Sequence, residues 1–136
     1  MNMKLLAAAA GVCALMSAGS AMAAWPASVV GVWTAFANQS PLQLNIVSQG
    51  TVGDCNAIIG TIADTVAGGQ RNSIQGFYCP HSGRIQFLRK NLVTNDTFQV
   101  YTGNLSMVGQ SLRIGGTFAE DDQIGALGEY NFWAVK

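Results

Sequence analysis

The sequence predicts an all-β protein, an eight-stranded antiparallel up-and-down β-barrel with one disulfide. Past residue 24 the chain consists of eight short runs of strand character separated by turn residues, and no segment has the length of a helix. Short turns join neighbouring strands as hairpins. Two cysteines lie at matching ends of two consecutive runs. Eight is the number of strands that closes a small barrel, which is filled by side chains or holds one small ligand.

The expected strands are defined by their residue patterns. They cover Val29–Phe36, Leu42–Ser48, Asn56–Asp64, Ser73–Cys79, Arg84–Leu92, Thr97–Ser106, Ser111–Glu120 and Glu129–Val135. Alternation is clearest in the second run, where Leu42, Leu44 and Ile46 share one face and polar side chains the other. This period of two indicates one buried and one wet face. The sixth and eighth runs carry apolar residues on both faces, as expected if the barrel also packs against another subunit.

Each break between these runs has turn chemistry. The breaks at 49–53, 67–70, 80–83, 94–96 and 108–110 are short and rich in Gly, Asn or Pro, whose backbone preferences favour turns. No connection is long enough to cross over a sheet. The sequence therefore favours a closed meander over an open sandwich.

The cysteine positions test this topology independently. Cys55 begins the third run and Cys79 ends the fourth, so in an antiparallel hairpin centred on Ala67, their midpoint, the two face each other. We therefore predict a Cys55–Cys79 disulfide, with two unrelated free thiols as the alternative. Closing a loop of this length stabilises a protein by roughly 3 kcal/mol in the chain-entropy model.

The first residues are typical of a signal peptide. Lys4 precedes an apolar, Ala-rich stretch over Leu5–Met16, and Ala21-Met22-Ala23 has the small-x-small pattern of a cleavage site. The stretch is shorter than the about 20 residues of a membrane span. We expect residues 1–23 to be removed, which leaves a single β-barrel domain over 24–136 that is periplasmic or secreted. Such an oxidising compartment favours the disulfide.

The charge and the motifs of the sequence argue against several classes of function. The mature chain carries six basic and seven acidic side chains, and the basic ones are too few and too scattered for a nucleic-acid-binding face. No second apolar stretch reaches membrane length, so we expect no membrane association of the mature form. The sequence holds one histidine and no zinc-protease, nucleophile-elbow or phosphate-loop motif. We predict a non-catalytic protein with no cofactor and no metal.

Short motifs along the mature chain follow the order and spacing of a known family. They are Gly31-Val32-Trp33, Ile59-Gly60-Thr61-Ile62, Phe87-Leu88-Arg89-Lys90-Asn91, Tyr101-Thr102-Gly103-Asn104, Arg113-Ile114 through Phe118, and Tyr130-Asn131-Phe132. With these motifs the chain resembles the avidin and streptavidin barrels, members of the wider calycin group, over nearly the whole mature domain. The resemblance implies an avidin-like barrel.

The biotin-binding positions of that family are mostly changed. Ala35 stands where the family has Asn, Ile62 and Asp64 where it has Tyr and Ser, Arg89 and Phe118 where it has two Trp, and Tyr130 where it has Asp or Asn. A buried biotin ureido group would lose roughly 1–3 kcal/mol for each missing hydrogen bond. We therefore expect a small ligand other than biotin.

The inner face near one mouth of such a barrel carries the candidate site. Asp64, Arg89, Gln99, Phe118 and Tyr130 would form an apolar cup with a few convergent polar groups, as in a small-ligand pocket. The Arg89 guanidinium suits a carboxylate or phosphate. Alternatively, Arg89 pairs with Asp64 or points to solvent. The first hypothesis is thus a small-molecule-binding barrel.

The second hypothesis is a protein-interaction module, such as a periplasmic inhibitor, that acts through the loop at 80–84. This loop is polar, adjoins the disulfide and contains His81, Ser82 and Arg84, and such loops often contact partners. The simpler interpretation of His81 is a solvated turn, since a zinc site needs three or four ligands. An open, wet mouth favours the first hypothesis, and an interior filled by Leu and Phe favours the second.

Two further features have a simple and a functional interpretation. Glu120-Asp121-Asp122 is an acidic cluster, expected to be a solvated turn rather than a calcium site because it lacks alternating oxygen ligands. Trp133 alternates with Phe132 and should face outward. An outward Trp fits a subunit contact in a homo-oligomer, with chance exposure as the alternative.

Overall fold

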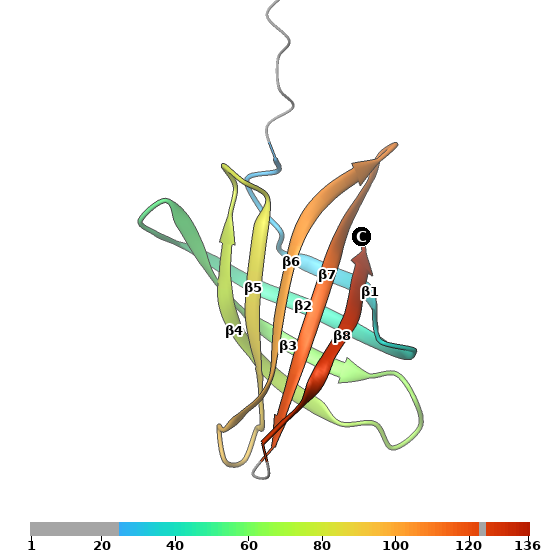
Figure 1. Cartoon of the computed structure of the whole chain (residues 1–136). Helices are drawn as coiled ribbons and strands as arrows, with labels where there is room; N and C mark the ends of the chain where they lie inside the picture. The colour runs from blue at the N-terminus through green and yellow to red at the C-terminus, as the bar shows by residue number, and fades with distance from the viewer. Residues whose placement is uncertain (1–24, 123–124) are drawn as a thin grey trace, which may run out of the picture.

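Eight antiparallel strands, each paired with its neighbours in sequence, close into a barrel (Figure 1). The structure is a computed structural model and describes residues 25–122 and 125–136, so the predicted signal peptide at 1–23 lies outside the described residues. The strands are β1 (Gly31–Ala37), β2 (Ser40–Val52), β3 (Cys55–Asp64), β4 (Arg71–Cys79), β5 (Arg84–Lys90), β6 (Thr97–Val108), β7 (Ser111–Asp122) and β8 (Gly125–Val135). The predicted fold class is confirmed. None of the described segments is a helix that could cross a bilayer.

Several strands are longer than their apolar patterns. β2 continues beyond the predicted end at Ser48 because backbone pairing persists through the predicted turn, with Val52 opposite Cys55. β5 instead ends two residues before the predicted Leu92. There the Asn91 side chain accepts hydrogen bonds from the backbone N–H of Val93 (2.8 Å) and of Thr94 (3.2 Å). Ladder hydrogen bonds need no apolar side chain, whereas an Asn that bonds its own backbone ends a strand.

The β3–β4 hairpin has the register that the cysteines predict. Asn56 lies opposite Tyr78 and Ala63 opposite Arg71, so the hairpin is centred on Ala67. The Cys55–Cys79 disulfide is present, with the two Cα atoms 4.2 Å apart. The prediction of this pairing is confirmed.

Aromatic side chains fill the middle of the barrel. Phe87, Tyr101, Phe118 and Tyr130 lie in one register row across β5 to β8, with successive ring centroids 4.8, 5.1 and 5.3 Å apart. Phe132 meets Phe87 and Tyr101 edge-on. Rings in such stacked and edge-on arrangements bury large apolar areas and attract one another, so this row divides the interior into two ends.

One end is covered by residues 25–30, and we call it the closed end. It carries the β2–β3, β4–β5 and β6–β7 turns, and the segment approaches the β4–β5 turn in Figure 1. The Tyr78 hydroxyl donates to the Pro26 carbonyl (2.6 Å), and the indole N–H of the fully buried Trp33 donates to the Val29 carbonyl (3.0 Å). The Gln49 amide donates to Ala27 O (2.6 Å) and accepts from Val29 N–H (3.1 Å). The segment is therefore fixed by hydrogen bonds as well as by burial.

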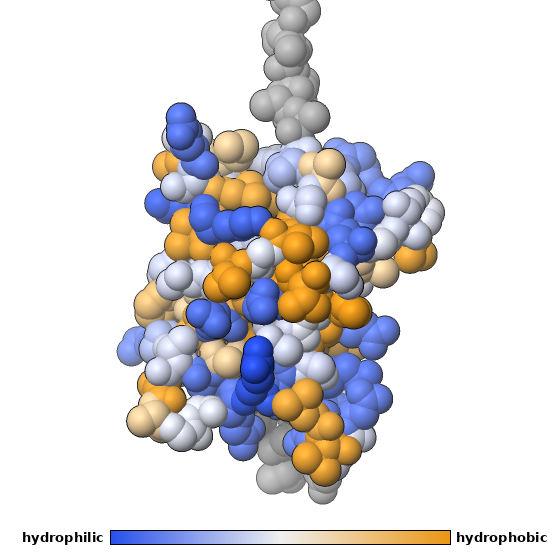
Figure 2. Space-filling model, turned by 180° about the vertical axis from the view of Figure 1, so that it is seen from behind, coloured by the Kyte–Doolittle hydropathy of each residue, from blue (hydrophilic) through white to orange (hydrophobic). Residues whose placement is uncertain are grey.

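The outer face of the barrel is partly apolar. Val32, Val47, Ile59, Phe77 and Trp133 are between 36% and 54% exposed. Seen from behind, apolar groups lie scattered among polar ones (Figure 2). Trp133 faces outward, as predicted, and its ring stacks on Phe36 with centroids 4.6 Å apart.

Candidate functional site

The opposite end of the barrel, which we call the open mouth, contains a cavity of about 490 Å³. It lies where the β1–β2 and β3–β4 connections meet the interior. Its apolar walls are Ala37, Pro41, Leu42, Val66, Phe98 and Phe118, and its polar walls are Asn38, Ser40, Asp64, Gln70, Arg89, Gln99, Glu120 and Tyr130. All five residues of the predicted pocket line this one cavity. Its volume falls within the about 300–1,000 Å³ of small-ligand sites.

Arg89 is the centre of the polar network. Its Nε donates to Asn72 Oδ1 (2.9 Å), its Nη1 to Gln99 Oε1 (3.2 Å) and its Nη2 to Asp64 Oδ1 (3.1 Å). The residue is only 5% exposed, and its guanidinium carbon lies 5.4 Å from the Phe98 ring centroid. Of the alternatives for Arg89, pairing with Asp64 is the one found in the structure.

The second polar group is the Gln99 amide. Its Oε1 accepts from Arg89 and from the Tyr101 hydroxyl (2.8 Å), while its Nε2 donates to Glu120 Oε1 (3.2 Å). Two donors on the oxygen fix the orientation of the amide, so its N–H is directed to Glu120. Burial raises the pKa of Tyr101 to about 12, although the nearby Arg89 charge acts in the opposite direction. Tyr101 is therefore held as a neutral donor.

Strand order explains how the polar and aromatic groups are layered. Arg89, Gln99 and Glu120 form one register row across β5, β6 and β7. The aromatic row of Phe87, Tyr101 and Phe118 lies two residues away on each of these strands, further from the mouth. Because alternate residues of a strand share a face, the aromatic rings form a floor beneath the polar groups.

Asp64 connects the network to the rim. Its Oδ2 accepts from the Gln70 backbone N–H (3.3 Å), and its own N–H donates to Gln70 O (3.0 Å). The Asp64 side chain is 29% exposed, against 7% for that of Arg89. The carboxylate thus lies nearer to solvent than the guanidinium that it pairs with.

Three members of the network were not predicted as site residues: Asn72, Tyr101 and Glu120. The same period of two identifies them, because Asn72 shares the inner face with Ile74, Tyr101 with Gln99, and Glu120 with Phe118. Glu120 is a correction as well. It was placed at the end of the seventh predicted strand, in an acidic cluster expected to be solvated, but it is half-buried and lines the cavity, and β7 continues to Asp122.

Two changed biotin positions lie deeper. Ala35 and Ile62 are both fully buried in the core. Neither side chain carries a hydrogen-bonding group. These two positions are therefore apolar packing positions in this chain.

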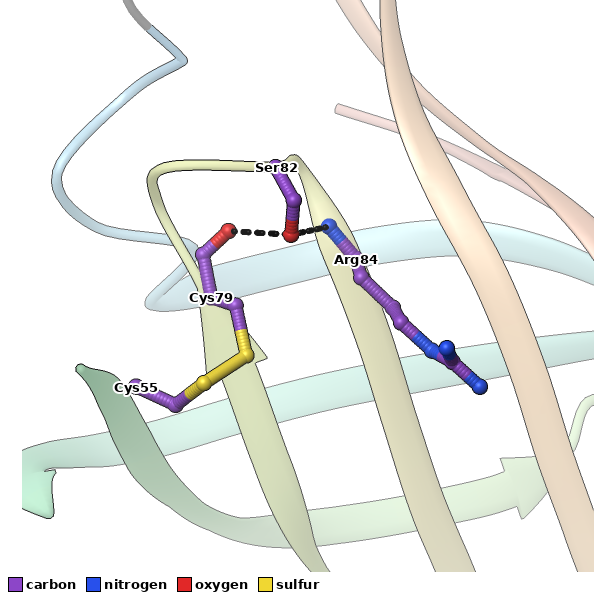
Figure 3. Close-up of a disulfide and its surroundings, with 4 residues drawn as sticks. All are labelled: Cys55, Cys79, Ser82 and Arg84. Atoms are coloured by element: carbon purple, nitrogen blue, oxygen red, sulfur yellow. Dashed lines mark hydrogen bonds between the residues drawn. A yellow bond between two sulfur atoms is a disulfide. The ribbon is translucent and has the colours of Figure 1, made fainter. Parts of the chain in front are cut away.

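The loop of the alternative hypothesis lies at the closed end, away from the cavity. His81, Ser82 and Arg84 are exposed there. Ser82 Oγ accepts from Arg84 N–H and donates to Cys79 O, at 3.4 Å each, next to the disulfide (Figure 3). Gly83 O accepts from Leu105 N–H (2.7 Å). The loop is anchored to the sheet, and its polar side chains face solvent.

Within the described residues, no group of three or more His, Cys, Asp or Glu side chains is placed to hold a metal ion. Comparison of the chain with protein-family models, with curated proteins and with solved structures finds no match. The functional interpretation therefore depends on the geometry of the chain itself.

Proposed function

We propose that the mature protein is a non-catalytic binding protein that holds one small molecule, other than biotin, in the open mouth of its avidin-like barrel. We further propose that it acts in the periplasm or outside the cell, as a homo-oligomer. The observation that carries the binding role is the hollow, polar-lined mouth of a barrel whose middle and other end are filled. An open, wet mouth is the feature that favours a ligand over a protein partner.

Two properties of the cavity support this role. Its volume of about 490 Å³ suits a small organic molecule. Its polar groups converge from four strands, with Asp64 on β3, Arg89 on β5, Gln99 on β6 and Glu120 on β7, and Arg89, Asp64 and Gln99 are already held by mutual hydrogen bonds. Polar groups fixed before binding lower the entropy cost of capturing a ligand.

Native mass spectrometry of the mature protein from its own host tests the proposal. We expect a small mass retained on each subunit and no uptake of added biotin. The substitution Ala37→Leu, which adds volume to the cavity wall, should remove the retained mass. The matched control Ala119→Leu adds the same volume on the exposed outer face of β7 and should leave it.

A bare protein would contradict the binding role and would favour the loop at 80–84 as a partner site. Uptake of biotin would contradict the argument from the changed contacts. The same spectra report the number of subunits.

A further inference from the structure

The charged groups of the cavity are unequal in number and in accessibility. Among the residues that the structure describes along its walls, two carboxylates, Asp64 and Glu120, face one guanidinium, Arg89. Asp64 is 29% exposed at its side chain and Glu120 is half-buried, whereas the Arg89 side chain is 7% exposed. A molecule that enters the mouth therefore meets negative charge before it meets the cation.

The guanidinium already uses three of its five N–H donors. Its Nε and both Nη nitrogens each donate to a different side chain, Asn72, Gln99 and Asp64. Recognition of a carboxylate or phosphate by Arg uses two parallel donors on one edge of the fork. An anion that bound through the donors now used by Gln99 or Asp64 would leave a buried or half-buried polar group without its partner, which is costly. The two remaining N–H donors belong to a side chain that is only 7% exposed.

Glu120 is not ion-paired with that guanidinium. In the described part of the chain the ion pair of the mouth is Arg89 with Asp64, and Glu120 is bound instead by the neutral amide of Gln99. Its hydrogen-bond partner therefore carries no charge that would neutralise the carboxylate. Inside a partly desolvated cavity, such a carboxylate favours a cation strongly.

The remaining walls favour a flat apolar group. The Phe118 and Tyr130 rings lie 5.3 Å apart with planes inclined by 33°, and both line the cavity. Phe98, Val66 and Leu42 supply further apolar surface. Aromatic faces attract flat apolar groups and also cations.

We propose that the ligand of the open mouth is a small organic cation, an amine or an amidinium carried on a flat apolar group, with Glu120 and Asp64 as its acceptors. This inference rests on the proposed small-molecule role and specifies the chemistry of the same cavity. It replaces the expectation that Arg89 would select an anion.

Three probes of nearly the same shape test whether the cavity prefers a cation: benzamidinium, neutral benzamide and anionic benzoate. Isothermal titration calorimetry of the mature protein should show benzamidinium binding at least about tenfold more tightly than benzamide, as expected for one charge-assisted hydrogen bond. Benzoate should not bind. Raising the salt concentration should weaken benzamidinium binding selectively.

Substitution of Glu120 tests whether its carboxylate causes the preference for benzamidinium. Glu120→Gln keeps the size of the side chain and should weaken benzamidinium about tenfold without changing benzamide. The control Glu129→Gln removes the same charge from an exposed position on β8 and should change neither. An equal effect of both substitutions would show a general charge effect and overturn the assignment.

The outcomes separate the two proposals. If benzoate or benzamide binds as tightly as benzamidinium and Ala37→Leu abolishes that binding, the cavity is a ligand site but the charge inference is wrong. If no probe binds and the purified protein carries no retained mass, both proposals fail.

Discussion

The closed end and the open mouth belong to the same eight strands but are built from different chemistry. At the closed end, the hydrogen bonds join side chains to the backbone of residues 26–29 and accompany full burial of Trp33 and Val29. At the open mouth, side chains bond mainly to one another around a cavity. A buried polar network is weak evidence for stability, because desolvation offsets much of its attraction. We therefore expect the closed end to contribute more to the stability of the barrel, and this difference supports the binding role that we propose for the open mouth.

The largest expected effect lies at the closed end. Trp33→Ala should lower the free energy of unfolding by about 4 kcal/mol, since it empties a fully buried site and removes the donor to Val29 O. Urea denaturation followed by circular dichroism measures this. If Trp33→Ala does not fold, Trp33→Phe should cost about 1 kcal/mol or more from the lost hydrogen bond. If both variants unfolded at the same urea concentration as the wild type, the closed end would not be the main source of stability.

The second-largest expected effect concerns Tyr101, which belongs to the aromatic row between the two ends. Burial raises the pKa of Tyr101 to about 12 from 10.0, so the folded state binds the phenol proton more tightly than the unfolded state does. The resulting stabilisation, about 2–3 kcal/mol, is fully present below pH 10 and is lost as the pH rises from 10 to about 12.

Urea midpoints between pH 8 and pH 11.5 measure this loss. Tyr101→Phe has no proton to lose, so its stability should fall less steeply with pH than that of the wild type. Equal slopes for Tyr101→Phe and the wild type would contradict the role assigned to Tyr101.

The third effect concerns the ion pair at the open mouth. Arg89→Met should cost about 2 kcal/mol, below the about 3–5 kcal/mol for breaking a fully buried pair, because Asp64 is partly exposed and retains some hydration. Adding Asp64→Asn to Arg89→Met should recover about half of that loss, since the Asp64 charge is then no longer left without its partner. A double variant less stable than Arg89→Met alone would mean that Asp64 stabilises the fold independently of Arg89.

The fold could be predicted from the sequence because strand period, turn residues and the cysteine midpoint each constrain the same topology. The five pocket residues were expected together because each was assigned to the inner face of its strand, near one mouth of the barrel. What the sequence did not reveal is which polar groups pair. The pairing of Arg89 with Asp64, Gln99 and Asn72 depends on the stagger of four strands, and side-chain alternation says nothing about stagger around a barrel. Glu120 was correctly included in the seventh strand, but an acidic cluster at a strand end does not by itself reveal that its first side chain lines the cavity.

The smallest effect on stability is expected where the effect on binding is greatest. Glu120→Gln should change the free energy of unfolding by less than about 0.5 kcal/mol, because the Gln oxygen can accept the same hydrogen bond from Gln99 and the half-buried side chain keeps its volume. Urea denaturation measures the change, with Glu129→Gln as the exposed reference. A loss above about 1 kcal/mol would show that Glu120 stabilises the barrel itself. A near-zero change together with weakened benzamidinium binding would show that the open mouth retains a carboxylate that the fold does not need, as expected of a group kept for its ligand.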